Sequence, residues 1–430
     1  MITLLLFGGL VIFLLLNVPI GISIGCASFL AVLASDTLGH TFIAASLVTA
    51  SDSFPLMAIP LFIIAGELMG AGGVSKRLLN VFNAFFGRIT GGLAIVTIVV
   101  CMFFAAVSGS GPATVAAVGT MVVPTMLEKG YSKPFTLGLI AAAGSIGVII
   151  PPSIPMVVYG VSTNTSISGL FMGGFGPGLL IGFSLIIYCY FYAKKRGWKD
   201  DRDPIPFKEK LGIIWEAKWA LINPIIILGG IYRGIFTPTE AAAVAAVYAF
   251  LCGALIYREF TPKELFFTMT RAFSTNGTTM VIIGCATAFA KILTIEQVPV
   301  IISNAILGIS DNAIIILLII NIILLIVGCV MDTTPAIMVL APILLPIAQV
   351  YGINPIHFGL IMVVNLAIGF CTPPLGINLF VSARVGQTTL DKVVSGVIAF
   401  VLIMIIDLML ITFIPAISMA IPSAFGQMGR

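Results

Sequence analysis

The sequence predicts an all-α polytopic membrane protein, built as an inverted-topology repeat with two re-entrant helical hairpins. Its composition predicts the membrane class, because 59% of the 430 residues are hydrophobic and 9% are charged, whereas a soluble domain carries roughly 25% charge. A duplication predicts the repeat, because residues 108–155 and 330–378 share one pattern of glycine and proline. The matched positions are Pro112 and Pro335, Pro124 and Pro346, Gly130 and Gly352, Gly147 and Gly369, and Pro151-Pro152 and Pro373-Pro374.

The membrane spans follow from hydrophobic length, since about 20 apolar residues cross a bilayer. This criterion predicts full crossings at residues 2–34, 52–72, 134–160, 168–193, 219–234, 239–257, 273–291, 356–383 and 394–420. The first of these stays apolar for longer than the hydrophobic region of a signal peptide and lacks its preceding charge. We therefore interpret it as a span, with a cytoplasmic N-terminus.

Two further apolar blocks, 90–128 and 312–350, are each interrupted near the middle by Gly, Ser, Thr and Pro residues. The interruptions are Ser108–Pro112 and Met331–Pro335. Polar backbone at membrane depth is tolerated only inside protein or beside a water-filled cavity. We therefore expect both blocks to be re-entrant hairpins with buried tips.

Segments between the spans are predicted to lie at the membrane surface. Residues 74–88 and 292–308 are amphipathic and read as interfacial helices. The charged stretch 199–217 reads as a surface helix or arm.

Charge orients the predicted spans. With residues 194–218 on the cytoplasmic side, 18 of the 21 basic residues fall on that side, leaving Arg233, Lys291 and Arg430 outside. Because the basic residues lie in loops between spans, the net charge of +4 does not indicate nucleic-acid binding. The same topology sends matched segments through the membrane in opposite directions. It divides the chain into a first repeat (1–211), a connector (212–238) and a second repeat (239–430).

The duplicated tips are the best candidates for a binding site, since paired broken segments mark the substrate and ion sites of secondary transporters. Unwound backbone exposes carbonyls for cations and amides for anions. Residues 108–111 should face 144–148, and residues 328–334 should face 369–372. The alternative is that the glycines only permit close helix packing, which does not explain two matched copies.

Three acidic residues lie in apolar segments. Asp332 is first a candidate for binding sodium, substrate or a proton. The compatible alternative is that it caps a helix starting at Thr333. Glu67 is as compatible with a structural pairing as with transport. For Asp407 we expect a structural or partner-facing polar contact.

The two hairpins, the SGSGPATVAAVGT tip, the PPS and TPP breaks and the string IPLFIIAGELM together resemble the large membrane subunit of tripartite ATP-independent periplasmic (TRAP) transporters. The resemblance covers essentially the full chain. It implies a sodium-driven importer of carboxylates with an elevator mechanism, within the ion transporter superfamily, in the bacterial inner membrane. It also implies two partners, a small four-span membrane subunit (here a separate chain) and a periplasmic substrate-binding protein. The pattern looks closest to the sialic-acid branch, and the C4-dicarboxylate members look much alike.

The resemblance also implies which residues bind ions and substrate. One sodium site of the family would correspond here to Ser108, Gly109, Ser110, Gly144, Gly147 and Val148. The other sodium site would correspond to Gly328, Asp332, Gly369 and Thr372. Substrate would lie between the tips near Ser108, Ser110, Asp332 and Thr333, and the hairpins would move as one body with spans 134–160 and 356–383.

Three other functions remain as alternatives. A standalone sodium/dicarboxylate symporter would carry Ser-Asn-Thr at both tips, where this chain has Ser-Gly-Ser and Asp-Thr-Thr. An intramembrane protease needs a Ser–His or paired-Asp arrangement, yet His40 and His357 lie near predicted span ends. A purely structural scaffold leaves the polar tips unexplained.

Overall fold

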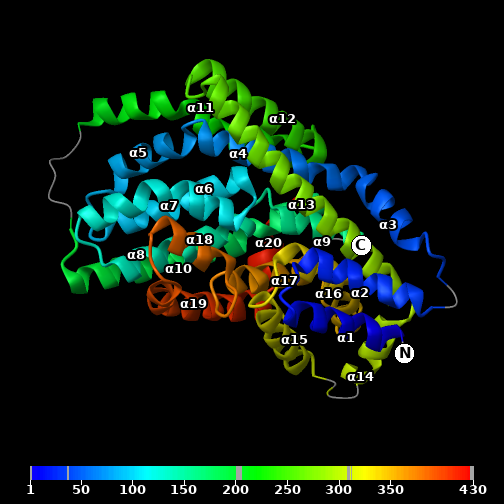
Figure 1. Cartoon of the computed structure of the whole chain (residues 1–430). Helices are drawn as coiled ribbons and strands as arrows, with labels where there is room; N and C mark the ends of the chain where they lie inside the picture. The colour runs from blue at the N-terminus through cyan, green and yellow to red at the C-terminus, as the bar shows by residue number, and fades with distance from the viewer. Residues whose placement is uncertain (1, 36–37, 200–205, 308–309, 311, 427–430) are drawn as a thin grey trace.

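The computed structural model describes the chain except residues 1, 36–37, 200–205, 308–309, 311 and 427–430. All regular secondary structure in the described residues is helical, which confirms the predicted class (Figure 1). Seven segments among them are long and apolar enough to cross a membrane: Phe54–Ala71, Ile167–Arg196, Phe207–Tyr232, Pro238–Ile256, Pro262–Ile295, Thr333–Val350 and Leu390–Phe413.

The helices recur in one order along the two halves of the chain. The first copy comprises α5 (Val74–Phe86), α6 (Gly92–Ser108), α7 (Gly111–Glu128), α8 (Lys133–Ser145), α9 (Ile154–Thr163) and α10 (Ile167–Arg196). The second comprises α14 (Val298–Leu307), α15 (Ala313–Gly328), α16 (Thr333–Val350), α17 (Pro355–Gly369), α18 (Ile377–Val385) and α19 (Leu390–Phe413). Matched helices begin at a nearly constant offset, as α6 and α15 do at Gly92 and Ala313.

The two hairpins form as predicted. Helices α6 and α7 are the arms of the first hairpin, and α15 and α16 are the arms of the second. The predicted breaks in 134–160 and 356–383 also form, at Pro151-Pro152 and Pro373-Pro374. The second arm of each hairpin packs on the helix that follows the break of the opposite repeat, α7 on α18 and α16 on α9. The two repeats are therefore interlocked around their broken segments.

The helices that precede each hairpin differ between the copies. The first copy has α3 (Phe42–Ser51), a 3₁₀ turn at Phe54–Met57 and α4 (Ala58–Ala71), whereas the second has the continuous helix α13 (Pro262–Ile295). Pro55 interrupts the first copy because proline lacks the amide that helix continuation needs. Helix α12 (Pro238–Leu251) packs against α4, and α13 packs against α3 and α4.

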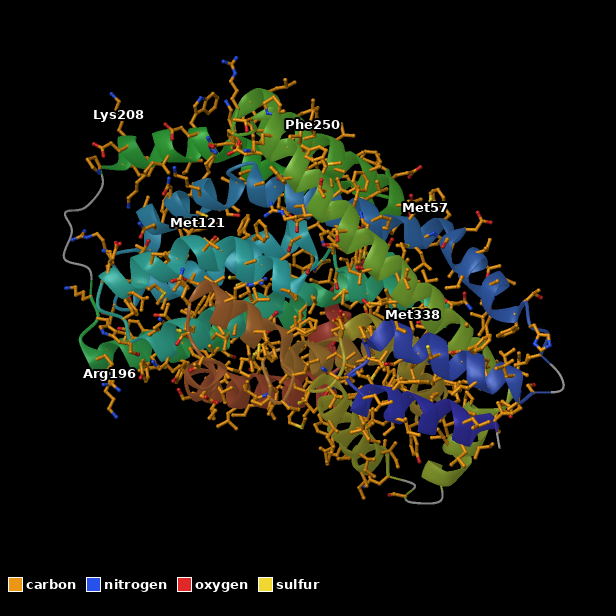
Figure 2. The ribbon with its side chains drawn as sticks, viewed as in Figure 1. Met57, Met121, Arg196, Lys208, Phe250 and Met338 are labelled. Carbon is orange, nitrogen blue, oxygen red and sulfur yellow. The ribbon has the colours of Figure 1, made fainter. Side chains whose placement is uncertain are left out.

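The prediction of one crossing over 2–34 is wrong. The segment forms two packed helices, α1 (Ile2–Leu15) and α2 (Ile20–Leu33), which turn at Asn17 with φ 60° and at Pro19. Each has 14 residues and so spans about 21 Å, which is short of a hydrocarbon core of about 30 Å. The N-terminus lies at the end of the molecule opposite Arg196 and Lys208 (Figures 1 and 2). The cytoplasmic orientation of the N-terminus and of segment 194–218 stays a prediction.

Two other boundaries differ from the predictions. Helix α11 (Phe207–Tyr232) is continuous and joins the predicted surface arm to the predicted span 219–234. The predicted span 394–420 is divided at Pro415, between α19 and the short helix α20 (Ala416–Ala424).

Candidate functional site

The first hairpin tip is a tight turn whose polar groups are held by its own residues. Gly109 ends α6 in the left-handed conformation with φ 59°, and Ser110 is the extended N-cap of α7. The Ser108 hydroxyl lies 3.0 Å from the Thr114 hydroxyl, and Thr114 Oγ1 donates to the Ser110 carbonyl at 2.8 Å. Ser108 is 2% exposed, so its hydroxyl braces the turn from inside the protein.

The first broken segment lies directly against this tip. A Cβ on Gly147 would lie 2.8 Å from the Ser110 carbonyl oxygen and 2.7 Å from Thr114 Oγ1, so the approach requires glycine. The Gly109 carbonyl accepts from the Ile154 amide at 3.3 Å. The Val148 carbonyl accepts from the Ser153 hydroxyl at 2.6 Å. Sequence reasoning brought these two segments together correctly, and Gly144 packs beside them against Val115.

The second tip is capped by its own carboxylate. Asp332 is the N-cap of α16, and its Oδ1 accepts from the Thr333 amide at 2.6 Å. The capping role expected for Asp332 is therefore confirmed. Thr333 and Thr334 are 3% and 6% exposed.

The second broken segment packs on the second tip. A Cβ on Gly369 would overlap the backbone of Gly328, and the Leu375 amide donates to the Cys329 carbonyl at 3.0 Å. Thr372 donates its hydroxyl to the Ile368 carbonyl at 2.9 Å. The two breaks differ in burial, because Pro151 and Pro152 are buried whereas Pro373 and Pro374 are exposed.

Both tips contribute to one cavity of about 210 Å³. Five of the residues predicted for sodium or substrate line it: Gly109, Ser110, Val148, Asp332 and Thr333. Six others lie in the supporting contacts described above and do not line it: Ser108, Gly144, Gly147, Gly328, Gly369 and Thr372. The tips of the two hairpins therefore meet, as the duplicated sequence pattern suggested.

Sequence reasoning missed two hydroxyl residues of this cavity. Thr275 and Thr279 line it from α13, a helix outside both hairpins. They are one helical turn apart, so both can face the same side. The run of polar residues from Ser274 to Thr279, inside a predicted span, is the signal that would have pointed to them.

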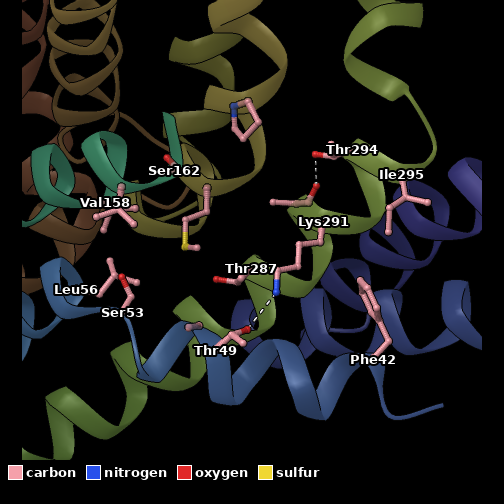
Figure 3. A pocket seen from close by; sticks show the side chains of 15 residues that line it. Phe42, Thr49, Ser53, Leu56, Val158, Ser162, Thr287, Lys291, Thr294 and Ile295 are labelled. Atoms are coloured by element: carbon pink, nitrogen blue, oxygen red, sulfur yellow. Dashed lines mark hydrogen bonds between the residues drawn. The ribbon is translucent and has the colours of Figure 1, made fainter. Parts of the chain in front are cut away.

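Two larger cavities adjoin the same helices. One of about 430 Å³ lies between α4, α13 and the first hairpin, where Arg271 Nε approaches Glu67 Oε2 at 3.7 Å. Glu67 therefore has the structural pairing that was one of its two expected roles. The other, of about 500 Å³, lies between α3, α13, α9 and α16 (Figure 3).

The remaining acidic candidate is structural. Asp407 is 3% exposed and accepts a hydrogen bond of 2.8 Å from Ser184 of α10. This agrees with the expected polar contact within the protein.

The structure is that of a membrane protein with two repeats, and the hairpin tips and broken helices of both repeats lie around one cavity. The family model described as "Tripartite ATP-independent periplasmic transporter, DctM component" matches residues 7–417. The chain belongs to this family. It is a TRAP large membrane subunit and a multi-pass transport protein, not an enzyme, which confirms the resemblance read from the tips.

Similar proteins carry different substrate names. The chain is 49% identical over 414 residues to the isethionate TRAP transporter permease protein DctMQ of Oleidesulfovibrio alaskensis, covering 96% of this chain and 65% of that protein. It is 41% identical to the C4-dicarboxylate large permease protein DctM of Pseudomonas aeruginosa, with 94% and 95% covered. It is 35% identical to the sialic acid large permease protein SiaM of Vibrio cholerae, with 96% and 97% covered. The sialic-acid protein is thus less similar to this chain than the isethionate protein.

A solved structure shares the fold. The Alcanivorax borkumensis YdaH transporter, reported to have an unusual topology, superposes with a TM-score of 0.58 at 13% identity, covering 92% of this chain and 91% of that one. This likeness concerns the fold alone.

Proposed function

We propose that the chain carries a small organic acid anion into the cell together with sodium, as the large subunit of a tripartite importer in the bacterial inner membrane. One observation carries the proposal: the tips of both hairpins, which are far apart in sequence, line one cavity of about 210 Å³. Polar backbone of this kind persists inside a membrane protein where it lines a cavity or a binding site.

The oxygen atoms around the first tip suit sodium. The carbonyls of Gly109 and Val148 accept the hydrogen bonds described above, and a carbonyl oxygen has a second lone pair to offer. Ser110 adds a hydroxyl at the cavity wall, and Ser108, Gly144 and Gly147 hold that turn in place. Around the second tip, Asp332 offers a carboxylate, with Thr372, Gly328 and Gly369 in the adjoining contacts.

An acid group suits the same cavity. Helix N-termini stabilise anions, and the cavity lies at the N-termini of both α7 and α16. Ser110, the N-cap of α7, makes no side-chain cap hydrogen bond. Thr333, Thr275 and Thr279 supply hydroxyls. Sodium bound beside the tips would order them and so favour substrate binding, which couples the two.

An elevator movement is supported by where the larger cavities lie. On one side of both cavities lie α13 and its neighbours α3 and α4. On the other side lie the hairpin arms α7 and α16 and the helix α9 that follows the first break. A boundary with space on either side of the site is suited to sliding. The hairpins with α8, α9, α17 and α18 would move, and the other spans would form the scaffold.

Among possible substrates we place isethionate first, because the relative named for it has the highest sequence identity of the three relatives described above. Succinate, as a C4-dicarboxylate, and sialic acid are the other acids to test. The small membrane subunit, as a separate chain, and the periplasmic binding protein are the partners proposed.

The test is uptake into proteoliposomes that contain this chain and the small subunit, with the binding protein outside. We expect accumulation of one of the three acids under an inward sodium gradient and none under an equal potassium gradient. Accumulation without the two partners would favour a standalone symporter. Equal accumulation with potassium, or none of any acid with both partners present, would overturn the proposal.

A further inference from the structure

The cavity of about 500 Å³ contains a lysine that the proposed transport cycle has not used. Lys291 is near the end of α13 and lines this cavity together with Thr287 and Thr294 of the same helix (Figure 3). It is one of three basic residues that the charge pattern places on the outer side of the membrane. Its side chain extends towards Thr49, and Nζ donates to the Thr49 hydroxyl at 3.1 Å (Figure 3).

Lys291 has no acidic partner among the described residues. Its hydrogen-bond partner Thr49 is neutral, and none of the ion pairs between described residues includes Lys291. Arg271, in the cavity beside the N-terminal third of α13, differs because Glu67 lies 3.7 Å from it. Twenty residues separate the two cations, or about 30 Å of helix, which is the thickness of a hydrocarbon core.

The lysine cavity lies next to the tip cavity. Helices α9, α13 and α16 line both. On α16 the lining passes from Thr334 to Met338, one turn or about 6 Å along the axis. On α13 it passes from Thr279 to Thr287, about 12 Å. Lys291 is one turn further still, so it serves a separate position from the tip residues.

The walls suit a small organic anion. Phe42, Leu56, Ile295 and Met338 are apolar, and a few hydroxyls and one ammonium group are placed among them. Ligand sites in proteins combine this volume and this kind of lining.

We propose that this cavity is an entry station, where Lys291 pairs with the carboxylate or sulfonate of the substrate before it reaches the tip cavity. The inference rests on the proposed function for the identity of its ligand. None of the described residues that line the station is acidic, so we expect it to take up the acid whether or not sodium is present. The tip cavity, by contrast, is expected to need sodium.

The experiment compares Lys291→Met with Lys291→Arg, which keeps the charge, and with Thr49→Val, which removes the hydrogen bond and leaves the lysine. Arg233→Met is the matched control, because it removes an exposed basic residue predicted on the same side that lines none of these cavities. The probes are isethionate and succinate, with an uncharged alcohol of similar size. The measurements are KM and maximal rate of sodium-driven uptake, and the acid-dependent rise in unfolding temperature of the purified protein without sodium.

We expect Lys291→Met to raise KM and the sodium-free half-saturation concentration about tenfold, a change of about 1.4 kcal/mol, with the maximal rate within about twofold. Lys291→Arg and Arg233→Met should resemble the wild type. Thr49→Val should raise KM less than Lys291→Met does, because the ammonium group remains, and the alcohol should give no stabilisation. Unchanged values for Lys291→Met, or equal losses in Thr49→Val, would overturn the entry station. If wild-type uptake does not depend on sodium, the proposed function fails, and the sodium-free measurement still decides the role of Lys291.

Discussion

Ser184 Oγ donates a hydrogen bond of 2.8 Å to Asp407 Oδ1, and the two residues are separated by 223 positions. Helices α10 and α19, which carry them, begin at Ile167 and Leu390, which are separated by the same interval. The two residues therefore occupy equivalent places in the two repeats. When equivalent positions touch, the axis that relates the repeats passes between them.

This hydrogen bond should stabilise the contact between the repeats. Asp407 Oδ2 has no hydrogen-bond partner among the described residues, so Ser184→Ala would leave a buried carboxyl group without any donor. We expect the free energy of unfolding to fall by about 1–3 kcal/mol, measured by denaturant titration in detergent. Ser395→Ala, at an exposed position of the same helix α19, is the control. Replacing both partners, as in Ser184→Ala with Asp407→Leu, should recover part of the loss. If Ser184→Ala is as stable as Ser395→Ala, the hydrogen bond does not stabilise the contact between the repeats.

Asp332→Ala should abolish sodium-driven uptake while the protein is still expressed in the membrane, because the carboxylate caps α16 and lines the tip cavity. Asp332→Ser separates these two roles, since serine caps a helix about as well as aspartate but carries no charge. We expect the serine variant to unfold near the wild-type temperature and to show no uptake. Wild-type uptake by Asp332→Ser would show that capping is the whole role of this residue.

Gly369→Ala should force α15 and α17 apart, because the added methyl group would overlap the backbone of Gly328. Overpacking of this kind costs about 1–3 kcal/mol, and the second tip would be displaced with it. We expect lower thermal stability and lower maximal uptake. Gly277→Ala is the matched control: it is a helical glycine with open space around it, where alanine is neutral or stabilising. Equal effects of the two substitutions would contradict this account of Gly369.

Thr275→Val and Thr279→Val remove hydroxyls from the tip cavity and keep the shape of the side chain. If either hydroxyl contacts the acid, KM should rise about fivefold to tenfold, the effect of losing one hydrogen bond of ~1 kcal/mol. Thermal stability should change little. Thr278→Val is the control, because Thr278 is exposed on the same helix and does not line the cavity. A KM unchanged in both variants would remove α13 from the substrate site.

The hairpins and the breaks were predictable because their signals are local. Glycine and proline interrupt helices through their own backbone chemistry, and the interruptions predicted at Ser108–Pro112 and Pro151-Pro152 appear as such in the structure. The turn inside 2–34 was missed although Asn17 and Pro19 signal it, because the segment is hydrophobic along its whole length and so suggested one long span.

The substrate and the ion sites were less accessible to sequence reasoning. Ser108 was expected to contact ligands, yet its hydroxyl is turned inward by Thr114, a contact that exists only once the tip is folded. Thr275 and Thr279 reach the cavity from α13, which precedes the second tip in the chain and belongs to neither hairpin. The polar residues around position 275 mark this part of α13 as unusual for a span, but they do not show that it packs against the hairpin tips.

The sequence by itself determined that this chain lies in a membrane, that it is a repeat, and where its helices break, because hydrophobicity and the backbone limits of glycine and proline act over short stretches of chain. Only the tertiary structure decided that both tips share one cavity, that α13 lines it, and that Lys291 and Ser184 have the neighbours they have. Those facts depend on how helices from distant parts of the chain pack together, and packing is a property of surfaces that meet only after folding.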